Sequence, residues 1–314
     1  LLDADVGLMT TKLRGQPIGA QTLCLVERLS KLAGVNPRRI GLSATIGDQE
    51  EAAAFLGSGS GRETLVPEIE APGVRWKISM EHFYVEGPQA SEEREVKEYL
   101  PETNEKTDEA PENADPGLKY IYEYSKGKKC LVFSNSREEC EAVTSTLRQY
   151  CRLKREPDRF LIHHGNLSAS YRESAEDLMK NDDVSMTTCT TSTLELGIDI
   201  GRLERAFQID APFTVSSFLQ RMGRTGRRGQ PQERCFVMRE DPPEMRAMLP
   251  TTVPWKLLQG IALVQTYLEE KWVEPPRLSQ KHYSLLFHQT LSVLVSAGPL
   301  TPAALASRVL SLAA

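Results

Sequence analysis

The chain has 314 residues, of which 40% are hydrophobic and 26% are charged, and its formal net charge is -5. This composition is typical of globular proteins, the length favours roughly two domains of about 150 residues, and the charge excludes a uniformly basic coat for nucleic acid. No run approaches the roughly 20 apolar residues that cross a bilayer. We therefore expect a soluble cytoplasmic protein without a membrane partner.

The six cysteines show neither C-x-x-C spacing nor nearby histidines. They are Cys24, Cys130, Cys140, Cys151, Cys189 and Cys235. A zinc site or a disulfide framework would need closer or paired spacing. The sequence therefore predicts reduced thiols in a protein core and no metal site within these residues.

The first 60 or so residues resemble part of an α/β unit. A helical pattern over residues 21–32 leads into the strand-like run RRIGL at 38–42, and then into SATIGD at 43–48. Residues 92–116 are acidic, poor in aromatic residues and broken by three prolines. That composition indicates a mobile linker or a surface excursion.

Residues 118–240 alternate short apolar runs with amphipathic stretches, which predicts a parallel sheet covered by helices. Strands are expected at 128–134, 184–190 and 205–210. Helices should begin near Ser168 and Thr214, and Ser136 should open a capping box with Glu139. Ligands of open α/β sheets bind beyond the carboxyl ends of the strands. Chemistry is therefore expected in the loops at 163–168 and 192–201.

Beyond residue 250 the pattern becomes helical, over 255–272, 284–298 and 301–314. The last two runs are joined by a short turn that contains glycine. Such a pair indicates either a helix-turn-helix or an ordinary helical hairpin.

Residues 220–229 read QRMGRTGRRG, with four arginines and three glycines. In a helical segment Arg224 and Arg227 project from one face, and the glycines leave room for a ligand. Guanidinium groups remain charged and bind phosphate oxygens bidentately. The cluster is either such an anion clamp or a solvated basic loop, and its neighbours favour the clamp.

Five phrases in order resemble motifs III to VI of superfamily 2 helicases. They are SATIGD (43–48), FSNS (133–136), HHGNLS (163–168), TSTLELGIDIG (191–201) and QRMGRTGRR (220–228). The last two phrases, with residues 257–275, are most similar to the Lhr-like branch. The resemblance covers roughly residues 13–314 and implies a RecA-like α/β fold. It implies part of a first RecA-like domain at 1–75, a second at 76–240, and a helical region that begins a winged-helix domain at 241–314.

The resemblance also implies how ATP is handled. Arg224 and Arg227 match the arginine fingers that reach the terminal phosphates, Gln220 would help to orient them, and Arg221 would brace the structure. Asp199 matches the carboxylate that accepts ribose hydroxyl hydrogens, with Gly197 allowing close approach; the alternative for Asp199 is a loop cap. Ser43, Ala44 and Thr45 match the segment that couples nucleotide state to domain closure, unless they are simply a polar strand end.

A second set of residues matches positions that hold a nucleic-acid strand by its phosphates. It comprises Thr191 and the backbone near Ser134, Asn135 and Gly165, with Arg172 as a possible further phosphate contact. Small hydroxyls and N–H groups suit this task because they do not read bases. Without the motifs, Thr191 could equally have a core or capping role, and Arg172 a solvated one.

The sequence contains no G-x-x-x-x-G-K-S/T phrase and no acidic magnesium motif ahead of SATIGD. ATP and Mg²⁺ would therefore be held mainly by motifs outside these residues, and we expect the chain alone to hydrolyse ATP negligibly. The segment DVGLMTT resembles a family segment that continues into those motifs. One hypothesis is therefore a gap between Thr11 and Lys12 in a larger helicase, which intact-mass measurement tests.

The resemblance implies an ATP-dependent helicase or translocase that acts on single-stranded or partly duplex nucleic acid. DNA and 3′ to 5′ movement follow from the Lhr-like likeness alone. Two alternatives stay open: an RNA helicase of the same superfamily, and a non-catalytic RecA-like module that binds nucleic acid.

Overall fold

The computed structural model describes residues 6–9, 17–42, 47–67, 76–85, 111, 115–181, 183–195, 203–223, 232–243, 248–274 and 283–310. By packing, the chain divides into two compact units. One comprises Leu1–Ala71 and Lys271–Ala314, and the other comprises Pro72–Glu270. The domain boundaries expected from the sequence, at 75 and 240, stay predictions.

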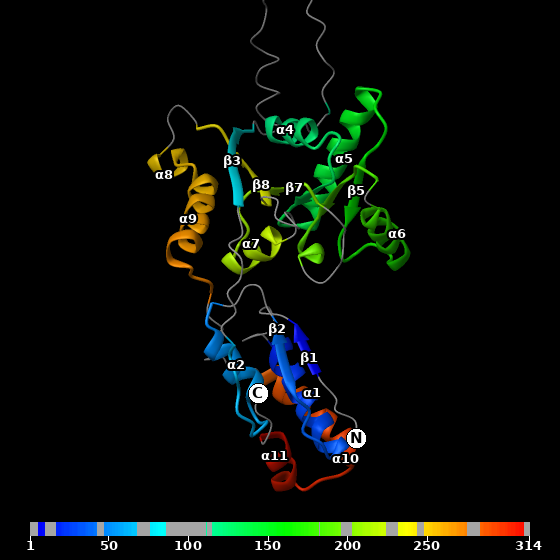
Figure 1. The fold of residues 1–314 in the computed structure, drawn as a ribbon, viewed down its shortest axis with the longest axis vertical. Coiled ribbons are helices and arrows are strands. Elements are labelled where there is room, and N and C mark those ends of the chain that lie inside the picture. The colour runs from blue at the N-terminus through cyan, green and yellow to red at the C-terminus, as the bar shows by residue number, and fades with distance from the viewer. Residues whose placement is uncertain are drawn as a thin grey trace, which may run out of the picture. The chain divides into compact units, whose positions relative to one another are not determined.

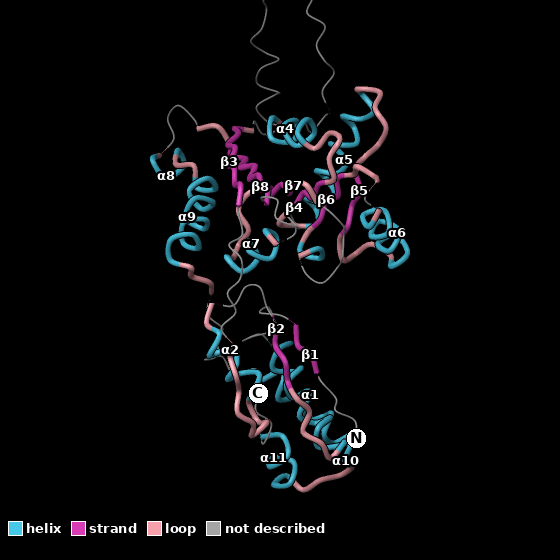
Figure 2. Tube along the Cα trace, viewed as in Figure 1, coloured by secondary structure: helices cyan, strands magenta, loops and turns pink. Residues whose placement is uncertain are grey.

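The larger unit is built on a six-stranded sheet with the order β3-β8-β7-β4-β6-β5 (Figures 1 and 2). In chain order the strands are β3 (Trp76–Tyr84), β4 (Cys130–Phe133), β5 (Phe160–His163), β6 (Thr187–Thr190), β7 (Arg205–Ile209) and β8 (Gln232–Glu240). Every pair of neighbours is parallel, so all carboxyl ends lie at one edge. The predicted RecA-like parallel sheet is thus confirmed.

Helices cover both faces of this sheet, as Figure 1 shows. They are α4 (Pro116–Tyr124), α5 (Arg137–Leu153), α6 (Ala169–Lys180), α7 (Val215–Met222) and α9 (Trp255–Glu270); the short helix α8 (Leu249–Thr252) precedes α9 and has no buried residue. Val132 and Val237 face the layer with α4 and α5, whereas Leu131 and Phe133 face Met179 of α6. All four β4 residues are therefore buried, as expected of a central parallel strand.

The helix starts follow the predicted caps. Ser136, Ser168 and Thr214 are the N-caps of α5, α6 and α7, and each side chain accepts a bond from a backbone N–H in the first turn. The capping box differs in one respect. The Glu139 carboxylate accepts from the N–H of Asn135 at 3.1 Å, one residue before the cap.

The strands β3 and β8 at one side of the sheet were not predicted individually. No side chain of β3 is fully buried, so its sequence lacks the continuous apolar run by which β4 is recognised. Its full-length parallel pairing with β8 joins residues 156 positions apart. Strand β5 was not predicted either. Its last residue, His163, had been assigned to the predicted loop at 163–168.

Helix α9 confirms the helix predicted over 255–272, and it packs on the β3 and β8 side of the sheet. A Cβ atom at Gly260 would overlap the Met238 methyl group, so a larger residue there would require the Met238 side chain to shift. Trp76 stacks on Tyr267 at 5.3 Å, which adds an aromatic contact between β3 and α9.

The other unit contains a parallel pair, β1 (Val6–Met9) and β2 (Arg39–Leu42). Its helices are α1 (Pro17–Ala33), α2 (Gln49–Gly57), α10 (Tyr283–Ala297) and α11 (Pro302–Leu310). They confirm the helical runs predicted at 21–32, 284–298 and 301–314. Arg28 of α1 donates to the Ser292 side chain and, at 3.2 Å, to its carbonyl oxygen. The start of a winged-helix domain stays a prediction.

Among the described helices, none is long and apolar enough by itself to cross a membrane. Helices α10 and α11 would meet that test only as a pair, and they are bent by 116° to one another.

All six cysteines are unpaired and buried, as the sequence predicted. Burial raises the pKa of Cys130 and of Cys189 to about 12, because the interior disfavours a thiolate. These thiols pack between sheet and helix as small apolar groups.

Candidate functional site

The carboxyl edge of the sheet brings several predicted strand-contact residues together. Phe133 of β4 and His163 of β5 both pair with Thr190 of β6. The residues that follow these strand ends therefore emerge side by side. Ser134, Asn135, Gly165 and Thr191 all lie there.

Ser134 and Asn135 already make protein hydrogen bonds. The Ser134 N–H donates to the Thr190 carbonyl oxygen at 2.9 Å, and the Ser134 side chain is fully buried. Asn135 Nδ2 donates to the Ala211 carbonyl oxygen at 2.9 Å, and Asn135 Oδ1 accepts from Arg221 Nη1 at 3.1 Å. The Asn135 amide side chain thus joins three elements of the edge.

Thr191 is half-buried at the start of the short 3-10 helix Ser192–Leu194, and its hydroxyl makes no capping bond to that helix. The adjacent loop is held by Thr193, whose hydroxyl lies 2.9 Å from His163 Nδ1. His163 Nε2 lies 3.1 Å from Glu176 of α6. Buried His163 therefore fixes the loop beside Thr191.

Gly165 is exposed, and an added Cβ atom would meet only Thr193 Cγ2 at 4.0 Å. The fold itself does not require glycine there. Arg172 lies in the first turns of α6, where its N–H donates to the Ser168 carbonyl at 3.1 Å. Its buried Nε atom has no hydrogen-bond partner among the described residues. A buried polar atom without a partner is costly, and the role of Arg172 as a phosphate contact stays a prediction.

Arg221 of α7 is buried and braces the edge, as the sequence predicted. Its Nε donates to Glu195 Oε1 at 2.9 Å, and its Nη1 donates to Gln208 Oε1 at 2.8 Å. Its Cζ lies 5.3 Å from the ring centroid of Phe133. Burial lowers the pKa of Arg221, and the Glu195 carboxylate opposes that shift. The arginine thus links the loops after β4 and β6 to α7.

Only Gln220 of the residues predicted to handle ATP lies in the described part of the chain. It is buried on α7, immediately before Arg221. The others lie outside the described residues; they are Gly197, Asp199, Arg224, Arg227 and the coupling segment Ser43, Ala44 and Thr45. The gap suggested between Thr11 and Lys12, and most of the acidic stretch 92–116, also fall outside them.

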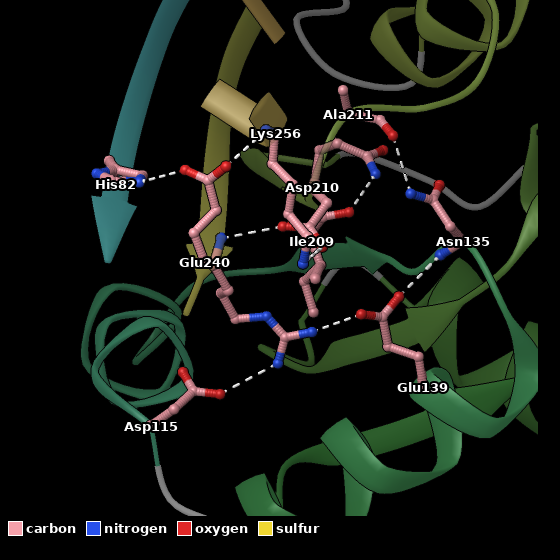
Figure 3. Close-up of polar contacts among 11 residues, drawn as sticks. His82, Asp115, Asn135, Glu139, Ile209, Asp210, Ala211, Glu240 and Lys256 are labelled. Carbon is pink, nitrogen blue, oxygen red and sulfur yellow. Dashed lines mark hydrogen bonds and ion pairs between the residues drawn. The ribbon is translucent and has the colours of Figure 1, made fainter. Parts of the chain in front are cut away.

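A second polar network adjoins Asn135 and is drawn in Figure 3. Arg239 of β8 pairs with Glu139 of α5 and, at 3.1 Å, with Asp115, the N-cap of α4. The Arg239 N–H donates to Asp210 Oδ1 at 3.0 Å, and Asp210 Oδ2 pairs with Lys256 of α9 at 2.9 Å.

The network continues from Lys256 to β3. Glu240 accepts from the Lys256 N–H at 2.7 Å, so it caps the start of α9 from the sheet. The other Glu240 oxygen lies 2.7 Å from His82 Nε2 of β3. Helix α9 is therefore tied to the carboxyl ends of β3, β7 and β8.

Sequence reasoning missed Glu195, Gln208 and Arg239. Glu195 carried a usable signal, because a carboxylate within the apolar run LELGI needs a cationic partner if it is buried. Arg239 carried none, since a charged residue at a strand end is most often solvated. In the described part of the chain, no group of three or more His, Cys, Asp or Glu side chains is arranged to hold a metal ion.

Comparisons with known proteins agree with this geometry. Residues 115–229 match the helicase conserved C-terminal domain. The Lhr helicase/uracil glycosylase of Escherichia coli is 29% identical over 68% of the chain, and the ATP-dependent helicase Lhr-Core of Sulfolobus acidocaldarius is 33% identical over 63%. The chain spans only 15% and 20% of the lengths of these relatives.

Among solved structures, the Mycobacterium smegmatis helicase Lhr bound to ssDNA and AMP-PNP matches with a TM-score of 0.72 and 23% identity. The match covers 98% of this chain and 36% of that one, and it supports the fold. Residues 115–229 therefore match the helicase conserved C-terminal domain, and the chain is similar to helicases of the Lhr type.

Proposed function

We propose that the chain is the strand-holding and ATP-sensing part of an ATP-dependent helicase or translocase. The observation that carries the proposal is the gathering of Thr191, Gly165 and Arg172 on neighbouring loops and helix at one edge of the parallel sheet. Thr191 offers a hydroxyl without a capping bond, Gly165 offers an open surface, and Arg172 lies in the helix that begins at Ser168 after the same loop.

ATP fits the residues of this chain by their chemistry. Arg224 and Arg227 would hold the terminal phosphates through planar donor forks, and Asp199 would accept ribose hydroxyls. ATP with Mg²⁺ supplies the phosphoryl group whose transfer is coupled to movement. Buried Arg221 connects the strand-side loops to α7, which precedes the finger segment. We infer that this connection couples strand binding to the finger segment.

The proposed partner is single-stranded or partly duplex DNA. Support comes from the M. smegmatis Lhr structure, which contains ssDNA, and from the Lhr-like relatives. RNA is the alternative, because contacts to phosphates do not separate the two unless a 2′-hydroxyl is bound. Competition between DNA and RNA oligonucleotides of one sequence distinguishes them. The 3′ to 5′ direction is likewise proposed from the Lhr-like resemblance.

Replacing Thr191 by valine tests the strand-holding role. The change keeps the side-chain shape and removes the hydroxyl, so it should weaken single-strand binding by about 1 kcal/mol, the scale of one hydrogen bond. The loss should be similar for unrelated base sequences, because phosphates carry no base code. Fluorescence anisotropy at one fixed salt concentration measures it.

Thr188→Val is the matched control, since Thr188 lies on β6, three residues before Thr191, and is buried with an unpaired hydroxyl. The affinity of the Thr188→Val variant for single-stranded nucleic acid should equal that of the unaltered chain. Arg224→Ala, in the ATP set, should also leave affinity without nucleotide nearly unchanged. If strand binding is instead lost with Arg224 and unaffected at Thr191, residues 220–229 are a nucleic-acid patch and the assignment fails.

A further inference from the structure

Glu139 places a negative charge directly beside the proposed strand path. One carboxylate oxygen accepts from the Asn135 N–H at 3.1 Å, and the neighbouring loop after β6 carries Thr191. Glu138 adds a second carboxylate in the same first turn of α5. A phosphate that approaches Asn135 therefore meets an acidic helix start, and like charges repel in proportion to their closeness.

Arg239 counters this charge from the far side of the carboxylate. Its Nη2 donates to the other oxygen of Glu139, and its Nη1 donates to Asp115 at 3.1 Å (Figure 3). One guanidinium thus serves two carboxylates. Without it, each carboxylate would lose an ion-pair partner at the edge of the sheet where the nucleic-acid strand is proposed to lie.

The position of Arg239 is fixed by contacts that do not involve Glu139. Its backbone N–H donates to Asp210 Oδ1, and Asp210 adopts a left-handed backbone with φ 51°. The second Asp210 oxygen is held by Lys256 at 2.9 Å. The guanidinium is therefore presented to Glu139 by a frame built from β7, β8 and α9.

We propose that Arg239 is a positioning residue for nucleic-acid binding, which neutralises Glu139 and holds its carboxylate on Asn135 so that a phosphate strand can pass. Arg239 itself contacts no strand in this arrangement, since its donors face Glu139 and Asp115. The inference rests on the proposed strand-holding function and adds a residue outside the helicase motifs to it.

The decisive experiment is a double-mutant cycle on Arg239 and Glu139 in the full 314-residue chain. The affinity of each variant for single-stranded DNA is measured by fluorescence anisotropy. Arg239→Gln should weaken binding about fivefold at low salt, the effect of one uncompensated charge near a phosphate. Glu139→Gln should bind equally or more tightly. The double variant should recover the affinity lost in Arg239→Gln.

Two further readouts separate charge from structure. The loss in Arg239→Gln should shrink as salt rises from about 0.05 M to about 0.3 M, because screening shortens the reach of the repulsion. Arg239→Lys keeps the positive charge without the planar fork, and should retain most of the affinity. Urea unfolding reports whether Arg239→Gln folds. If it does not, Arg239→Lys is the variant that tests the role of the charge.

Arg205 provides the matched control. It pairs with Glu233 at 2.8 Å at the start of β7, so it lies at the amino edge of the same sheet. Arg205→Gln removes the arginine of an ion pair that lies far from the carboxyl ends of the β-strands. It should leave the affinity for single-stranded DNA unchanged. An equal loss in Arg205→Gln would show that global charge alone is responsible and would overturn the inference.

Failure of the inference and failure of the proposed function give different results. If the unaltered chain binds strands and Arg239→Gln binds equally well, only the role of Arg239 is wrong. The same holds if the double variant stays as weak as Arg239→Gln, since structural damage is not repaired by removing Glu139. If the unaltered chain binds no strand, the proposed function and this inference both fall.

Discussion

Arg227→Ala, introduced into a longer protein that contains the ATP-holding motifs, should lower ATP turnover by about 10³ or more. Arginine fingers contribute about 10³ to 10⁵ in rate because they stabilise charge that develops on the transferred phosphoryl group. ATP affinity should change much less, since that contribution belongs mainly to the transition state. Steady-state turnover together with a nucleotide-binding measurement gives both quantities.

Two companion variants make the test of Arg227 specific. Arg227→Lys should restore little turnover, because a point charge does not reproduce the planar fork. Arg228→Ala removes a neighbouring charge from the same cluster and should have a far smaller effect. Turnover of Arg227→Lys at the level of the unaltered protein would contradict the finger assignment.

Arg221→Met should be the most destabilising single change at the described edge, at about 3–5 kcal/mol of unfolding free energy. The substitution keeps an apolar side chain of similar length but removes the buried guanidinium that pairs with the Glu195 carboxylate. Removing one member of a buried ion pair costs about this much. Urea unfolding of the 314-residue chain, followed by circular dichroism, measures the change.

The double variant Arg221→Met/Glu195→Leu identifies the cause. Replacing a whole buried ion pair by apolar groups is often neutral. The double variant should therefore recover much of the stability that Arg221→Met loses. Lys126→Met is the exposed counterpart: its pair with Glu156 is solvated and should contribute less than about 1 kcal/mol. A mild effect in Arg221→Met would show that Glu195 finds water or another partner.

The sequence was most informative where local rules act. The buried run of β4 and the caps Ser136, Ser168 and Thr214 were predicted because each depends on residues within one turn or one strand. The set of Ser134, Gly165 and Thr191 was implied by the family resemblance, and the shared direction of the parallel strands explains why these residues gather at one edge.

What escaped prediction depends on partners far apart in the chain. Glu139 was read as a simple capping residue, yet its carboxylate lies between Asn135 and Arg239, 100 residues away. Likewise the Asn135 side chain is occupied by Arg221 and the Ala211 carbonyl. A motif indicates which residues gather at an edge, but the direction of each polar atom is set by tertiary packing.

The pairing of β3 with β8 has a consequence for biosynthesis. Trp76 and its neighbours leave the ribosome 156 residues before the strand with which they pair. At about 5–20 residues per second this interval is roughly 8–30 s. During that time β3 is an unpaired strand that could join another nascent chain, and charged side chains counter such association. Lys77 and Glu81 on β3 are suited to protect the growing polypeptide until β8 is made.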